Sequence, residues 1–569
     1  MRVVGVSPDV WISSAALIED GNIVAAAAEE RFDRIKMSKA FPVKAMEFCL
    51  EKAGLNTGDI DNIAVPWNPG THIQTASIRY SQLMRWRGEY LYSVPSYLLN
   101  KFSLPNVNMV EEKLYFEDKS VSIFFVDHHL AHAANGFYLS PYEEAAILTI
   151  DGKGESETCL FAKGEGTSIK KIKSVEMPHS IGLLYSTFTE FLGFKPDSDE
   201  WKVMALAAYE NPENEYYEKI KKIVCLKEDG TFDLDLAYFT YYLFDRQPKM
   251  YSNKFVQVFG PPRIKRDKME RDVLKIAAAL QKIYEELVIH MLHNLYKVTK
   301  CTRLVLSGGC AMNSVFNGKI TSTTPFKEVF ISSCPDDSGT SIGAALYVYN
   351  SILGGSHRIV QCHNYWGPEF SNEQIEDTLR KFKVKYAFFE DIENNVAQLI
   401  SQGKLLGWFQ GKMEFGQRSL GNRSIIADPR NVESKQLVNQ AVKYRESFRP
   451  FAPSILEEYV DDYFLVPDKT KVPFMEKVYE IKNNKRPIIP AVVHEDGSGR
   501  LQTVSKETNP LFYSMINKFR EITGVPLVLN TSFNLNGEPL VCSPTDTIRT
   551  FFSCGLDFLA IGNYLVQKE

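Results

Sequence analysis

The sequence lacks several features that would place it in a specialised class of protein. Its nine cysteines are an odd number and form no CxxC pair, so neither a disulfide framework nor a zinc site is predicted. No run of about 18 uncharged apolar residues is present, which argues against a membrane-spanning helix. The N-terminal stretch MRVVGVSPDV lacks the basic segment and apolar run of a signal peptide. These absences predict a cytoplasmic protein that contacts no membrane.

The sequence also lacks an excess of basic residues. Its 65 Lys and Arg are outnumbered by 70 Asp and Glu, which gives a formal net charge of −5. This balance argues against a nucleic-acid partner, although it is compatible with a local basic pocket. A hydrophobic content of 44% and a charged content of 24% are typical of a globular protein. Since 569 residues are too many for one core, roughly two to four domains are expected.

The order of elements predicted at the N-terminus is typical of a ribonuclease-H-like half domain. RVVGV, SSAALIE and NIVAAAAEE predict three strands, FPVKAMEFCLEKAGL predicts a helix and IDNIAVPW predicts a further strand. A similar plan recurs with the strands SVSIFFV, EAAILTI, ETCLFAK, IKKIKSVEM, RLVLSGG and EVFISS and the helix VLKIAAALQKIYEELVIHMLHNLYKV. Two such halves predict the duplicated α/β architecture of actin, sugar kinases and related ATP-binding proteins.

A second domain is predicted after the Gly- and Ser-containing stretch SILGGSHR. Beyond it, KLLGWF, VPLVLN and FLAIGNYLV alternate with helical stretches, which predicts another α/β domain. We therefore divide the chain into domains 1–356 and 357–569. Residues 210–270 are rich in charged and aromatic side chains and predict an insertion in the first domain, such as a lid or a substrate wall.

The stretch HHLAHA contains a candidate metal-binding pair. His128 and His132 are four residues apart, so a helix would place them on one face, as in paired metal ligands. His129 would point elsewhere. Histidines at this spacing also occur without any metal, and the pair alone does not decide between the two interpretations.

Three turns that follow strands carry glycine and could receive phosphate. Asp151 begins the turn in DGKGE, which would suit a phosphate chain but also suits a plain hairpin. Gly308 and Gly309 end the strand in LVLSGGCAMN and precede a helix, where free N–H groups favour a nucleotide. Asp336 and Asp337 lie in the third turn. One of them could cap the helix that follows, or could be a carboxylate ligand beside the two histidines.

The C-terminal half gathers cations in loops that contain Phe, Gly, Pro and Asn. They are Arg418, Arg423, Arg430, Lys443, Arg445 and Arg449. A solvated face is the ordinary interpretation of a charge-rich stretch, but guanidinium groups in rigid loops suit phosphate and carboxylate oxygens. Arg500 follows in GSGRLQTV, and LVLNTSFNLNGEPLV adds Asn530 and Ser532. These residues together predict a pocket for a small anionic substrate.

Nine motifs together resemble one enzyme family, from about residue 3 to residue 565. They are EERFDRIKMSKAFP, HHLAHAA, DGKGE, KVMALA, LSGGCAMN, MEFGQRSLGNRSIIADPRN, KYRESFRPFAP, RLQTV and NTSFNLNGEPLV. In this order they resemble the O-carbamoyltransferases of the nodulation and antibiotic-tailoring type. The resemblance implies an actin-like N-terminal domain similar to the threonylcarbamoyl transferases. It also implies a C-terminal domain similar to the YrdC carbamoyl-adenylate-forming proteins.

The resemblance implies two linked reactions. Carbamoyl phosphate and ATP, the latter with Mg²⁺, would give carbamoyl-adenylate in the C-terminal domain. The carbamoyl group would then pass to a hydroxyl group of a small-molecule acceptor, of natural-product or sugar-like type, in the N-terminal domain. That domain would hold a divalent metal, with iron(II) as the expected ion. A homodimer is one assembly that the resemblance leaves open.

The resemblance also assigns residues to roles. The implied metal ligands are His128, His132 and Asp337. The implied carbamoyl phosphate and ATP ligands are Arg418, Lys443, Arg449, Arg500, Asn530 and Ser532, of which Lys443 and Arg449 would take part in catalysis. The implied nucleotide ligands in the N-terminal domain are Asp151, Gly308, Gly309 and Asn313.

This chain departs from the family pattern at one place. Where the family usually has His-Asp before the second strand, the chain has Trp11-Ile12, and neither side chain accepts a proton. We therefore expect Asp9, in the same turn, to be the general base.

Three rival functions are compatible with parts of the sequence. A tRNA threonylcarbamoylation enzyme shares both domain types, but the chain shows no basic arm for tRNA. A nucleotide-binding regulatory protein would keep the glycine turns without catalysis. A sugar kinase would need no C-terminal anion pocket and would phosphorylate its acceptor.

Overall fold

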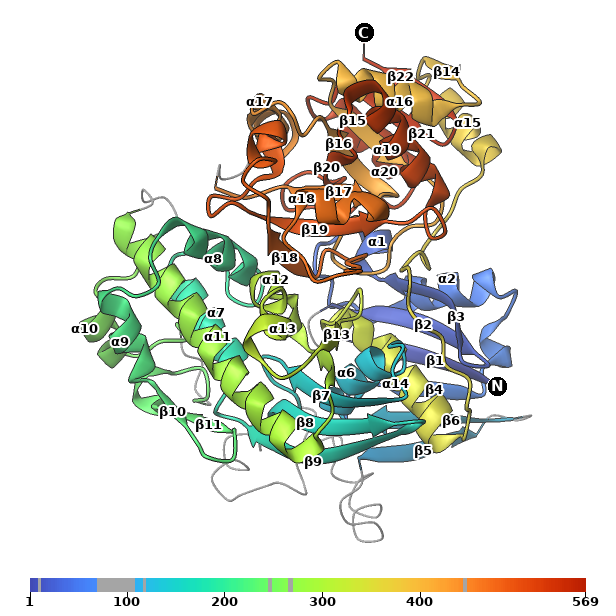
Figure 1. Ribbon diagram of the computed structural model, residues 1–569. Helices are drawn as coiled ribbons and strands as arrows, with labels where there is room; N and C mark the ends of the chain where they lie inside the picture. Colours follow the sequence, from blue (N-terminus) through green and yellow to red (C-terminus); the bar gives the residue numbers. More distant parts are fainter. Residues whose placement is uncertain are drawn as a thin grey trace.

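The computed structural model describes most of the chain (Figure 1). The described residues are 1–8, 12–68, 108–115, 119–243, 248–264, 270–443 and 448–568. Neither Asp9 nor Trp11, which the sequence places near the transfer step, is among them, and the same holds for Arg445.

The first sheet has the strand order β3-β2-β1-β4-β6-β5. Its strands are β1 Arg2–Ser7, β2 Ser14–Glu19, β3 Asn22–Ala28, β4 Asn62–Val65, β5 Met109–Tyr115 and β6 Ser120–Val126. Strands β1, β2 and β3 pair antiparallel, whereas β4 pairs parallel with both β1 and β6. The helix α2, Val43–Lys52, joins β3 to β4 across the sheet. This topology confirms the predicted ribonuclease-H-like half.

The second sheet repeats that arrangement, in the order β13-β12-β7-β8-β9. Its strands are β7 Glu144–Ile150, β8 Glu157–Glu165, β9 Ser168–Glu176, β12 Arg303–Ser307 and β13 Glu328–Phe330. Strands β7, β8 and β9 pair antiparallel, and β12 pairs parallel with β7 and β13. The N-terminal part is therefore the predicted duplicated, actin-like α/β fold.

Two helices cross between the sheets and bring the halves together. They are α6, His128–Phe137, and α14, Thr340–Tyr347, and both are fully buried. Gly343 of α14 permits their close approach, because a Cβ atom there would lie 1.9 Å from the carbonyl oxygen of Ala131 in α6. The small residues of both helices thus set the distance between the histidine helix and the turn that precedes α14.

The long helix α11, Arg271–Thr299, packs against the second half. The segment 210–270 adds α9 Glu215–Lys221, β10 Val224–Leu226, β11 Phe232–Leu234 and α10 Asn253–Phe259. Its aromatic residues are explained by a cluster in which Phe255 and Phe259 of α10 contact Phe188 of α7, Ile181–Phe191. In the described parts of the chain, neither α11 nor another helix has a stretch apolar enough to cross a bilayer.

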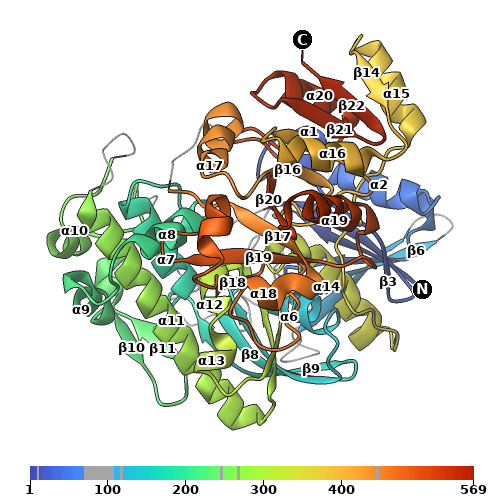
Figure 2. The same ribbon diagram turned by 45° about the horizontal axis from the view of Figure 1, so that its top comes forward.

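The C-terminal part forms a separate nine-stranded mixed sheet, in the order β14-β22-β21-β15-β16-β20-β17-β19-β18. The strands are β14 Tyr386–Phe388, β15 Leu406–Phe409, β16 Arg423–Ala427, β17 Ala452–Leu456, β18 Lys477–Glu480, β19 Ser498–Val504, β20 Leu527–Ser532, β21 Phe558–Ile561 and β22 Tyr564–Gln567. Its helices are α15 Asn372–Lys381, α16 Ile392–Ser401, α19 Pro510–Thr523 and α20 Pro544–Phe552. A core around Trp408 belongs to this sheet and its helices alone. Figures 1 and 2 show the sheet stacked on the two N-terminal halves.

Candidate active site

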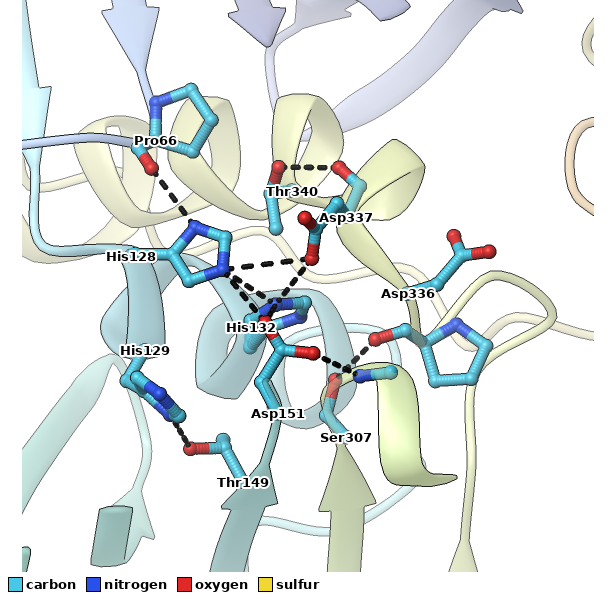
Figure 3. Close-up of polar contacts among 12 residues, drawn as sticks. Pro66, His128, His129, His132, Thr149, Asp151, Ser307, Asp336, Asp337 and Thr340 are labelled. Carbon is cyan, nitrogen blue, oxygen red and sulfur yellow. Dashed lines mark hydrogen bonds and ion pairs between the residues drawn. The ribbon is translucent and has the colours of Figure 1, made fainter. Parts of the chain in front are cut away.

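Four buried side chains from three elements converge between the two N-terminal halves (Figure 3). His128 and His132 come from α6, Asp151 follows β7, and Asp337 begins the turn before α14. His128 Nε2 lies 3.2 Å from Asp151 Oδ2, and His132 Nε2 lies 3.2 Å from Asp337 Oδ1. One ligand-type atom from each of the four residues lies within 4.8 Å of the others.

The donor atoms of this cluster suit a metal cation. His128 Nδ1 lies 3.2 Å from the carbonyl oxygen of Pro66. Because a carbonyl only accepts, Nδ1 carries a proton, which leaves Nε2 as the atom of His128 that would bind a metal ion. The Nε2 atoms of His128 and His132 are 3.1 Å apart, and neither oxygen of Asp337 has a hydrogen-bond partner in the described structure. Two imidazoles and two carboxylates in this arrangement are ligands that iron, manganese and zinc accept.

The electrostatics of His128 also indicate a place for positive charge. Burial alone would lower the pKa of His128, but Asp337 and Asp151 outweigh it and hold that pKa well above its ordinary value. Two buried carboxylates therefore need a compensating cation at this position, and a metal ion would provide it.

Asp151 is a member of this cluster that the sequence did not assign to it. Its Oδ1 accepts a hydrogen bond of 2.9 Å from the N–H of Gly309, so the amide predicted to bind a nucleotide is paired within the chain. Gly308, at φ 91°, packs against β7, where a Cβ atom would lie 2.2 Å from the carbonyl oxygen of Ile150. The SGG turn thus orients the Asp151 carboxylate.

Three other residues considered in the sequence lie apart from the cluster. His129 points away from it and bonds Thr149 through Nδ1 at 2.6 Å. Asp336 accepts a hydrogen bond from the N–H of Ser338 at 3.2 Å and caps the turn. Asn313 caps a helical turn at the N–H of Phe316 and is hydrogen-bonded to Gln281.

A cavity of about 1090 Å³ extends from the cluster to the C-terminal domain. On its N-terminal side the predicted residues that line it are Asp151, Gly309, Asn313 and Asp337. On its C-terminal side they are Arg418, Arg449, Arg500, Asn530 and Ser532. Gly308 does not line the cavity but packs against β7 next to it. The side chain of Lys443 is outside the described part of the structure. The two groups of residues, predicted in separate domains, therefore face one space.

The C-terminal end of the cavity is cationic. Burial lowers the pKa of Arg418 to about 10, although Asp336 across the cavity opposes this effect. The guanidinium group of Arg449 lies 4.0 Å from the ring centroid of Trp201, a residue of α8, Glu200–Leu206. A guanidinium group removed from water gains most from an anion that accepts its N–H groups.

Asn530 and Ser532 end β20 at the cavity. The Asn530 amide nitrogen donates to Ser454 Oγ at 3.0 Å and to Gln502 Oε1 at 3.0 Å, which fixes the side chain. Its Oδ1 is buried and has no partner among the described residues, so it is an acceptor left for a ligand N–H. Ser532 Oγ donates to Asn534 Oδ1 at 2.8 Å.

Two arginines of the predicted anion pocket lie outside the cavity. Arg423 is fully buried and donates to the backbone oxygens of Gln410 and Pro368. Arg430 pairs with Asp428 at 2.7 Å. Both stabilise the C-terminal domain itself.

The N-terminal domain contributes cavity residues that the sequence reasoning missed. Lys36 lines the cavity, and burial lowers its pKa. Trp201 supplies the ring beneath Arg449. Two motifs of the family resemblance could have indicated these residues. Lys36 lies in EERFDRIKMSKAFP, and Trp201 directly precedes KVMALA. Ile12 also lines the cavity and is buried, as an apolar residue would be.

Comparisons with known proteins identify the family of this chain. The family model described as the carbamoyltransferase N-terminus matches residues 2–346, and that of the carbamoyltransferase C-terminus matches residues 397–568. An uncharacterized protein of Synechocystis is 37% identical, over 100% of this chain and 97% of its own length. The nodulation protein NolNO of Sinorhizobium fredii is 36% identical, over 98% of this chain and 79% of its own.

A more distant relative has a named activity. The 3'-hydroxymethylcephem-O-carbamoyltransferase of Streptomyces clavuligerus is 27% identical, over 76% of this chain and 78% of its own length. Because the two family models cover most of the chain, and in the order that the motifs predicted, the protein belongs to the carbamoyltransferase family.

Proposed function

We propose that the protein is an ATP-dependent O-carbamoyltransferase that activates carbamoyl phosphate in its C-terminal domain and carbamoylates a small hydroxylated molecule in its N-terminal domain. One observation carries the proposal. The cationic end of the cavity and the His/Asp cluster, one on each domain, open into a single space. An activated carbamoyl group can therefore move from one to the other within a single cavity.

Activation takes place at the cationic end. Carbamoyl phosphate, ATP and one water give carbamoyl-adenylate, pyrophosphate and phosphate, and Mg²⁺ accompanies ATP. Arg418, Arg449 and Arg500 bind the phosphate oxygens, since each presents a fixed fork of donors. Lys443 joins them as a further cation, as the sequence predicts. Asn530 Oδ1 accepts an N–H of the carbamoyl group, which distinguishes this group from an acetyl group.

Transfer takes place at the His/Asp cluster. His128, His132 and Asp337 hold the metal ion, with Asp151 as an additional carboxylate. When bound, iron(II) supplies a Lewis acid that lowers the energy of charge developing on oxygen. The acceptor hydroxyl oxygen attacks the carbamoyl carbon, the bond to the AMP phosphate breaks, and the hydroxyl proton passes to a base. The chain orients both reactants in a space walled by two domains.

The base is assigned to Asp9 from the sequence. We expect Asp9→Asn to leave carbamoyl-adenylate formation intact and to lower transfer by roughly 10²–10⁴-fold, the usual contribution of a positioned base. Trp11→Ala should instead weaken acceptor binding. Both steps are measured in parallel, as pyrophosphate release and as carbamoylated acceptor. Full transfer by Asp9→Asn at saturating acceptor would place the base elsewhere.

The decisive test of the function uses ATP and carbamoyl phosphate. Pyrophosphate release from ATP should require carbamoyl phosphate, and mass spectrometry of hydroxylated metabolites should find the mass of one added carbamoyl group. Absence of carbamoyl phosphate-dependent release would indicate a regulatory protein. A phosphorylated acceptor would indicate a kinase, and a modified tRNA would indicate a threonylcarbamoylation enzyme.

A further inference from the structure

A short helix of the N-terminal domain reaches into the C-terminal domain. This helix is α1, Glu30–Asp33, which follows β3 and belongs to the EERFDRIKMSKAFP motif. Figures 1 and 2 both place α1 at the edge of the first half that faces the C-terminal domain. Phe32 packs against Met413, Leu540 and Cys542, so a small apolar cluster joins the two domains here.

Arg31 binds the loop between β15 and β16 (residues 410–422). Its Nη2 donates to the carbonyl oxygen of Gly416 at 3.0 Å, and its Nη1 pairs with Glu30 at 2.9 Å. Arg31 and Glu30 are both almost fully buried. A buried guanidinium group must satisfy its donors, and here the backbone of another domain satisfies one of them. Two residues after Gly416 the same loop presents Arg418 to the cavity.

Arg34 binds the loop between β20 and α20 (residues 533–543). It donates from Nη1 to the carbonyl oxygen of Leu540 at 2.6 Å and from Nη2 to that of Pro539 at 3.1 Å. Its Nε lies 3.6 Å from Asp546 Oδ1, at the N-terminus of α20. The strand that precedes this loop ends in Ser532, another cavity residue.

The β15–β16 loop is held from its other side as well. Gly416, at φ 129°, lies so close to the N-terminal domain that a Cβ atom would be 2.9 Å from the carbonyl oxygen of Ser333. Ser333 stands four residues before Asp337. The loop that carries Arg418 is thus enclosed between α1 and the chain segment that leads to the His/Asp cluster.

We propose that Arg31 and Arg34 are positioning residues that hold these two cavity-lining loops against the N-terminal domain and so keep the activated carbamoyl group from bulk water. The inference rests on the proposed two-step function. Each arginine acts through backbone carbonyls of a loop that lines the cavity, and Arg31 lines the cavity as well. If these bonds are lost, the cavity opens at the junction of the domains. Carbamoyl-adenylate then reacts with water to give AMP and carbamate, which breaks down to carbon dioxide and ammonia.

The test supplies ATP, Mg²⁺ and carbamoyl phosphate without an acceptor, and follows AMP and pyrophosphate in time. The wild-type protein should release a burst of pyrophosphate, near one per chain, and then form AMP slowly because the intermediate is retained. In Arg34→Ala the burst should persist while steady AMP formation rises roughly fivefold or more, the effect of losing a modest interaction. Arg34→Lys should lie between the two, because one ammonium group cannot replace the two-pronged contact.

Arg31→Lys tests the second arginine and keeps the charge beside Glu30, and an increase in AMP formation is again expected. Arg380→Ala, which removes an exposed arginine of the C-terminal domain, is the matched control and should behave as wild type. A merely structural role would lower the burst without raising AMP formation, and that result in both variants would overturn the inference. No carbamoyl phosphate-dependent pyrophosphate from the wild type would instead overturn the proposed function.

Discussion

The double variant His128→Ala, His132→Ala should lose its bound metal and all carbamoyl transfer, while pyrophosphate release from ATP continues. Both imidazoles are buried and direct Nε2 at the same point, so their removal takes away half of the four candidate ligands. The remaining carboxylates of Asp151 and Asp337 would face each other without a cation, which favours their protonation over metal binding. Elemental analysis of purified protein measures the metal, and iron is the expected element.

A matched control comes from the same helix. His129→Gln changes the histidine that bonds Thr149 and points away from the cluster, so it should keep its metal content. Circular dichroism and the thermal unfolding midpoint show whether either variant has lost its fold. Equal metal in the wild type and in the double variant would refute the assignment of the cluster. Loss of pyrophosphate release in a folded double variant would contradict the separation of the two steps.

Much of the N-terminal architecture was predictable because its antiparallel pairings are local. Strands β1, β2 and β3 lie close together in the sequence, and so do β7, β8 and β9, so alternation and turn-type residues specify them directly. The histidine pair was predictable for the same reason, because two residues four apart on a helix lie on the same face. Asp151 was missed as a cluster member because an Asp-Gly pair after a strand is equally a hairpin signal.

The shared cavity could not be read from the sequence. Arg31 and Gly416 are 385 positions apart, and no periodicity relates a helical turn to a loop in another domain. The arginine-rich stretch shows the same limit. Arg418 faces the cavity whereas Arg423, in the same motif, is buried against backbone carbonyls, and only the packing of the loop separates the two. The residue types of the motif were enough to predict an anion site. Which of its arginines form that site depends on the tertiary structure.

Arg418→Ala should strongly reduce activation while leaving the metal in place. Arg418 is held in a cavity wall where burial already lowers its pKa to about 10, so it remains charged at neutral pH and gains most from a bound anion. Hydrogen bonds to charged groups contribute ~1.5–3 kcal/mol each, and about 1.4 kcal/mol is a factor of ten in rate. Loss of a two-pronged contact should therefore lower carbamoyl phosphate-dependent pyrophosphate release by about 10²–10⁴-fold. Arg449→Ala should have an effect of similar size, with an added loss of its contact to Trp201.

The control for these variants is Arg430→Lys, which retains a cation beside Asp428 in the same arginine-rich stretch but outside the cavity. Its pyrophosphate release should match the wild type. Arg418→Lys should recover part of the lost rate, because a point charge keeps the attraction but not the forked geometry. The metal content of Arg418→Ala should stay normal, since the metal ligands lie on the N-terminal domain. Unchanged pyrophosphate release in both Arg418→Ala and Arg449→Ala would refute the assignment of this pocket to carbamoyl phosphate and ATP, because its cations would then serve another purpose.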